Sequence, residues 1–76
     1  MHADEIRQLL HASPFRPFIV YLASDKSFLV PHEDFALLTP KGRTLIVSYS
    51  DKEAVELLDV ALIARVEVQA PKASGS

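Results

Sequence analysis

The sequence predicts one small α+β domain that is mainly β, in which an N-terminal helix is followed by five short antiparallel strands. Three observations support this prediction. Residues 3–12 carry apolar side chains at helical spacing, residues 17–31 form the longest apolar stretch with one turn inside it, and several later segments alternate between apolar and polar residues. A chain of 76 residues is long enough for one domain with a marginal core.

We place this domain at residues 1–70. The remaining residues, 71–76, are small, polar and without periodicity, which predicts a flexible tail that is either natural or an added remnant.

The predicted helix at residues 3–12 is amphipathic. Ile6, Leu9 and Leu10 have the spacing i, i+3 and i+4, and two acidic residues stand near the start, where the helix dipole favours negative charge. Pro14 ends the helix, because the residue before a proline is pushed out of the α region. A helix this short is not stable alone, so we expect it to lie on an apolar surface.

The next segment, residues 14–18, reads Pro-Phe-Arg-Pro-Phe. We interpret it as a rigid connector whose phenyl rings cover one end of the core, because a small chain needs its aromatic residues for burial. The alternative is a polyproline-type ligand for a partner's groove.

The apolar stretch is predicted to form a β-hairpin, with strands at residues 18–23 and 27–30 around a Ser-Asp-Lys turn. The first strand places Phe18, Val20 and Leu22 on one face, and its other face is also apolar. Both faces therefore need a cover from the rest of the chain.

The second half of the chain is predicted to hold three further strands. A helical turn at residues 32–38 leads through a Pro- and Gly-containing turn to a strand at 44–49. Another Ser-Asp-Lys turn precedes a strand at 53–58, and the last strand is at 64–68.

Alternation predicts which side chains of these strands point inward. In the fourth strand we expect Val55 and Leu57 inward and Glu56 on the other face. In the last strand the inward residues are Ala64, Val66 and Val68, whereas Arg65 and Glu67 face solvent. The expected core is Val20, Leu22, Val30, Val47, Leu57 and Val66.

One internal correspondence suggests that the chain uses the same unit twice. Both hairpins turn on Ser-Asp-Lys, and each is followed by a similar pentad, at residues 34–38 and 59–63. In each unit an Asp, Asp34 or Asp59, is expected to cap a helical turn. The alternative is convergence, because Ser, Asp and Lys are common turn residues.

The predicted order of elements resembles small SH3-like barrels, and the N-terminal helix makes it similar to the Sm-like arrangement. This resemblance implies a five-stranded antiparallel barrel and assembly through paired edge strands into rings. No RNA-binding residue carries over, because the turn between the last two strands reads Leu-Asp-Val-Ala at residues 58–61 where Sm-like proteins have their signature. A second resemblance covers nearly the whole chain. Pro-Phe-Arg-Pro-Phe at 14–18 and Val-Pro-His-Glu-Asp-Phe at 30–35 are similar to a group of short, uncharacterised bacterial proteins, which imply no activity.

Composition narrows the class of protein further. The net charge of −2 does not favour nucleic acid as a partner, although the sequence leaves it open. The chain has no Cys, its first residues are polar and acidic, and no apolar run is long enough for a membrane span, so we expect a cytoplasmic protein that does not enter membranes. Hydrophobic residues make up 49% of this small chain, which indicates self-association or another protein as partner.

No catalytic residue, cofactor or metal site is predicted. The cluster His32, Glu33 and Asp34 is the one tight group of potential ligands, but three consecutive residues cannot all face one ion. A Ser-His-Asp site built across the fold has no strained nucleophile turn to support it.

Three residues are candidates for contact with RNA or a partner. Lys41 and Arg43 make the one locally positive loop, which could otherwise serve as a solubilising turn. Tyr49 could stack on a base if it were exposed, although a strand Tyr more often belongs to the core.

The sequence therefore predicts a non-enzymatic small β module that forms a homo-oligomer through strand edges and serves in protein interaction or assembly. The alternative is an Sm-like ring that binds single-stranded RNA through Lys41, Arg43 and Tyr49.

Overall fold

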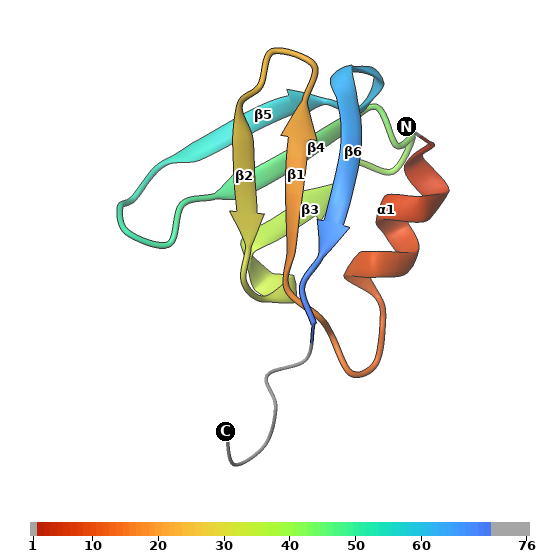
Figure 1. The fold of residues 1–76 in the computed structure, drawn as a ribbon, viewed down its shortest axis with the longest axis vertical. Coiled ribbons are helices and arrows are strands. Elements are labelled where there is room, and N and C mark those ends of the chain that lie inside the picture. The colour runs from red at the N-terminus through yellow and green to blue at the C-terminus, as the bar shows by residue number, and fades with distance from the viewer. Residues whose placement is uncertain (1, 71–76) are drawn as a thin grey trace.

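The computed structural model describes residues 2–70, so the predicted tail at 71–76 lies outside the described residues. One helix and six strands follow one another along the chain, with two short 3₁₀ turns between them (Figure 1). Their bounds are α1 Ala3–Leu10, β1 Phe18–Leu22, β2 Ser27–Val30, η1 Glu33–Phe35, β3 Ala36–Leu38, β4 Thr44–Ser48, β5 Val55–Asp59, η2 Val60–Leu62 and β6 Ile63–Val68.

The strands form two three-stranded antiparallel sheets, in the orders β2-β1-β6 and β3-β4-β5. In Figure 1 the first sheet stands upright and the second crosses obliquely behind it. The prediction of a mainly β fold with an N-terminal helix is confirmed, but the five-stranded barrel is wrong. The second half of the expected helical turn, residues 36–38, extends into the strand β3 and pairs with β4, which adds a sixth strand and separates two sheets.

The two halves of the chain share one order of elements: a hairpin, a 3₁₀ turn and a third strand. The third strands are exchanged. Strand β3 leaves the first hairpin to pair with β4, and β6 leaves the second hairpin to pair with β1. Each sheet therefore contains strands from both halves, and neither half can complete its sheet alone.

The two 3₁₀ turns differ in their caps, which corrects one sequence prediction. Asp59 precedes η2 and its Oδ1 accepts from the backbone N–H of Ala61 at 3.0 Å, as expected of a cap. Asp34 lies inside η1, whose cap position is His32, and no side chain makes a cap hydrogen bond there. The two similar pentads therefore do not occupy equivalent positions in the two halves, because Asp34 lies within its 3₁₀ turn and Asp59 precedes its own.

Helix α1 ends at Leu10, two residues earlier than predicted, and lies beside the edges of both sheets (Figure 1). It packs against β3, and Ile6 and Leu10 enter the core. Its N-terminal end meets the turn between β3 and β4. Gly42 there has a φ of +72°, and a Cβ at this position would stand 2.5 Å from the Cβ of Ala3, so both the turn and the helix contact require glycine.

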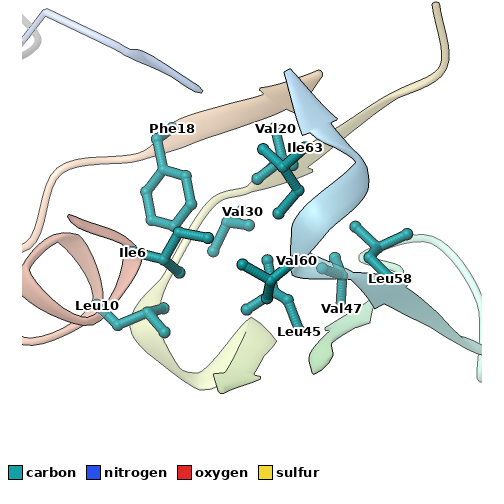
Figure 2. Close-up of a cluster of buried hydrophobic side chains, with 10 residues drawn as sticks. All are labelled: Ile6, Leu10, Phe18, Val20, Val30, Leu45, Val47, Leu58, Val60 and Ile63. Carbon is teal, nitrogen blue, oxygen red and sulfur yellow. The ribbon is translucent and has the colours of Figure 1, made fainter. Parts of the chain in front are cut away.

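The core is one cluster between the sheets, closed by α1 (Figure 2). Within residues 2–70 no polar or charged side chain is buried. The ring centroids of Phe15 and Phe18 lie 5.9 Å apart, so the Pro-Phe segment covers the end of the core as predicted. The buried residues are Ile6, Leu10, Phe18, Val20, Val30, Leu45, Val47, Leu58, Val60 and Ile63.

The predicted core is right for Val20, Val30 and Val47, whereas Leu22 and Val66 are partly buried against the cluster. It is wrong for Leu57, which is 66% exposed. Strand β5 turns its other face inward: Leu58 pairs with Leu45 and is 4% exposed. Alternation had correctly grouped Val55 with Leu57, but this pair faces solvent.

The inward face of β6 also differs from the prediction. The register shifts between its pairs with Tyr21 and Leu22, which leaves Ala64 as a bulge. The extra residue lets both Ile63 and Val66 face the core, and it places Ala64 in solvent. Val68, also expected inward, stays 40% exposed near the end of the strand. Arg65 and Glu67 are exposed, as predicted.

Candidate interaction surface

The outer face of the sheet β3-β4-β5 carries an uncovered apolar row. The strand register sets Leu37 and Leu57 on either side of Ile46, one residue from each strand. Leu37 is 63% and Leu57 66% exposed, and Ile46 between them is partly buried. Val55 continues the patch along β5 and is also exposed. We call these four residues the apolar row.

The equivalent face of the sheet β2-β1-β6 is built differently. Its central Ile19 is flanked by Leu29 on one side and by Glu67 on the other. The hydroxyl of Tyr21 donates to Oε1 of Glu67 at 2.9 Å, and the guanidinium carbon of Arg65 lies 3.8 Å from the centroid of the Tyr21 ring. Charged and polar groups therefore occupy the β6 side of this second outer face, whereas Leu29 stays exposed on its β2 side.

Strand β5 presents unpaired backbone groups beside the apolar row. The N–H of Tyr49 donates to the carbonyl of Ala54 at 3.0 Å, which makes these two residues a hydrogen-bonded pair in the β4-β5 hairpin. Because such pairs alternate along an antiparallel ladder, the peptide groups of Val55, Leu57 and Asp59 point away from β4. Among the described residues no strand pairs with this side of β5.

A second open edge, that of β2, borders a cleft of about 510 Å³ between β2 and the β4-β5 hairpin. Tyr49 is partly buried there: its ring centroid lies 6.4 Å from that of Phe28 and 4.4 Å from Nζ of Lys52. Its hydroxyl donates to Oε1 of Glu56 at 2.7 Å. This hydrogen bond raises the pKa of Tyr49, and desolvation and the negative charges of Glu56 and Asp51 raise it further.

The structure does not bring the three sequence-predicted contact residues together. Lys41 and Arg43 are exposed in the turn before β4, whereas Tyr49 follows the end of that strand. Arg43 and Tyr49 flank β4 on opposite ends, and the strand between them holds them roughly 20 Å apart along its length. The ring of Tyr49 is also in contact with Phe28 and Lys52, so it is not a free stacking platform.

Arg43 instead lines a shallow groove of about 660 Å³ between the start of α1 and the end of the apolar row. The groove also contains His2, Thr44, Leu57 and Asp59. The carbonyl of Arg43 accepts from the N–H of Val60 at 2.9 Å, which ties this turn to the second 3₁₀ turn.

The three residues of the cluster at 32–34 lie on the surface. Glu33 and Asp34 are exposed, and the ring of His32 packs beside Phe35 with centroids 5.8 Å apart. Over the described part of the chain, no group of three or more His, Cys, Asp or Glu residues is placed to hold a metal ion.

The sequence reasoning missed the apolar row, although one signal could have revealed it. Leu37-Leu38 and Leu57-Leu58 are adjacent apolar pairs within strands, and successive strand residues point to opposite faces. Each pair must therefore expose one leucine unless both faces of the sheet are covered.

In comparisons with known proteins, no family model, curated protein or solved structure matched the chain. The two resemblances drawn from the sequence therefore stay predictions. No helix within residues 2–70 combines the length and hydrophobicity needed to cross a membrane.

Proposed function

We propose that this chain is a non-enzymatic β module that self-associates and serves in protein interaction or assembly. The observation that carries the proposal is the apolar row beside the edge of β5 with which no strand of residues 2–70 pairs. Contiguous exposed apolar residues on a small domain mark an interaction surface, because leaving them in water costs free energy.

A second copy of the chain is the occupant that fits this surface best. A two-fold interface brings the same patch of two copies together, so the patch must be complementary to itself. The apolar row contains no charged residue, and hence meets its own copy without like-charge repulsion. Full burial of one leucine side chain contributes about 1.5–3 kcal/mol, so contact between exposed leucines of two copies favours association.

The experiment that tests the proposal is the absolute mass in solution, measured by light scattering over a range of protein concentrations. We expect a wild-type mass that is a multiple of one chain, and Leu57→Lys is expected to return it to a single chain. Leu29→Lys is the matched control, because Leu29 is 51% exposed and flanks the central isoleucine of the other sheet.

The two leucines make the test specific to one face. If Leu29→Lys reduces the mass and Leu57→Lys does not, the copies associate through the sheet β2-β1-β6, which contradicts the proposed surface. A wild-type protein that keeps the mass of one chain at every concentration would contradict self-association altogether.

A further inference from the structure

We infer that the second copy binds through β5, with the two β5 strands antiparallel about a two-fold axis that passes through Leu57. This inference rests on the proposed self-association and adds the edge, the direction and the register of the contact. It predicts a closed dimer with one continuous six-stranded sheet, in place of the ring that the Sm-like resemblance implies.

The alternation of peptide groups restricts the possible registers. Only residues whose N–H and carbonyl point away from β4 can form a hydrogen-bonded pair across the new edge, and these are Val55, Leu57 and Asp59. With the axis at Leu57, the two Leu57 residues face each other and Val55 faces Asp59 of the second copy. Each of the three residues whose peptide groups point away from β4 then pairs with another such residue of the second copy.

Charge selects the same register. An axis at Leu57 sets Glu56 opposite Leu58 and Asp59 opposite Val55, so neither carboxylate faces its own copy. An axis at Glu56 would place the two Glu56 side chains directly opposite each other, which is unfavourable for like charges in a sheet. An axis at Leu58 would shorten the paired segment, because the chain turns into η2 directly after Asp59.

Packing supports the β5 edge over the other edges. Helix α1 contacts β3 and borders a groove with Val66 and Val68 of β6, so it occupies the space beside both of these strands. At β2 a joined sheet would bring together only Ile19 and Leu29, next to Glu67. At β5 the apolar row of one copy continues into that of the second copy. The joined row runs across six strands, from Leu37 of one copy to Leu37 of the other.

The absence of Cys from the chain permits a direct test by single cysteine substitution. Facing residues of a hydrogen-bonded antiparallel pair have Cα atoms about 5.5 Å apart, which a disulfide can span. We expect Leu57→Cys to form a disulfide-linked dimer under mild oxidation. Val55→Cys is the matched control on the same face of the same strand, and its two copies would stand roughly 13 Å apart in this register.

The expected result is a rate of dimer formation for Leu57→Cys that is at least about tenfold that of Val55→Cys, because only the former satisfies disulfide geometry. A mixture of Val55→Cys and Asp59→Cys proteins should give the mixed dimer faster than either protein alone gives its own. This second measurement keeps Leu57 intact, so it remains valid if the substitution at Leu57 weakens association.

Light scattering of the uncross-linked wild-type protein separates the two possible failures. An oligomer in which Leu29→Cys cross-links fastest, or in which Val55→Cys exceeds Leu57→Cys, would overturn the β5 contact and leave self-association standing. A single-chain mass together with slow, equal cross-linking of all variants would overturn both.

Discussion

Glu67 and Leu37 each pair with an isoleucine of the central strand of their sheet, Ile19 in β1 for Glu67 and Ile46 in β4 for Leu37. Glu67 accepts the hydroxyl proton of Tyr21, whereas Leu37 is an exposed apolar residue without a polar neighbour in its row. At these positions the outer face of the sheet β2-β1-β6 is therefore polar, whereas the outer face of the sheet β3-β4-β5 is apolar.

The first prediction transfers the polar residue between the sheets. Leu37→Glu should leave the dimer mass unchanged, because the carboxylate stands at the far end of the apolar row, two strands from the β5 edge that the two copies share. The free energy of unfolding of the monomer should change by only about 0.5 kcal/mol, as for other exposed positions. Light scattering and urea denaturation measure the two effects. Loss of the dimer mass would show that the second copy covers the outer face of this sheet instead of joining it at the β5 edge.

The second prediction tests which face of β5 is buried. Leu58→Ala should lower the free energy of unfolding by about 2–5 kcal/mol, because it leaves a cavity beside Leu45. Leu57→Ala should cost less than about 1 kcal/mol when both are compared as monomers, since Leu57 is exposed. Urea denaturation at low protein concentration is the measurement. Equal losses for the two leucines would mean that the strand does not have one inward face.

The third prediction concerns the centre of the core. Val47 is 3% exposed on β4, so Val47→Asp buries an unpaired charge and should unfold the chain, as seen by circular dichroism. Glu67→Lys is the control, because Glu67 is exposed and loses only a surface hydrogen bond to Tyr21. A folded Val47→Asp protein would show that the core cluster is not required for the fold.

The fourth prediction concerns the titration of Tyr49. In a Tyr21→Phe background Tyr49 is the sole tyrosine, and its ultraviolet absorbance should report a pKa above the ordinary value of about 10. Glu56→Ala should lower this pKa, because it removes the hydrogen bond and the nearby negative charge. The same pKa in both proteins would mean that the contact with Glu56 does not persist in solution.

The raised pKa also fixes the direction of a stability effect. The folded chain holds the Tyr49 proton to higher pH than the unfolded chain, so the contribution is complete below the unfolded pKa. It is lost as the pH rises from about 10 through the folded pKa. The slope of unfolding free energy against pH in this alkaline window should become smaller in Tyr49→Phe.

Local features of the sequence determined the helix and the two hairpins of this protein. The spacing of Ile6 and Leu10 defines the buried side of α1, and Pro14 keeps the helix short. Both Ser-Asp-Lys segments lie in hairpin turns, where Asp25 adopts a φ of +72° that Asp tolerates better than most residues. Helix spacing and turn chemistry involve neighbouring residues only, so a single sequence contains them.

Tertiary structure alone decided how the third strands pair and which faces of β5 and β6 are buried. The exchange of β3 and β6 depends on contacts between segments far apart in the chain, which local patterns do not encode. Alternation shows that Val55 and Leu57 share a face of β5, but it does not show whether that face is buried. A one-residue change of register moves every side chain of a strand to the opposite face. Pairing of Leu58 with Leu45 settled the direction of β5, and with it the exposure of Val55 and Leu57, whereas the bulge at Ala64 settled the inward face of β6.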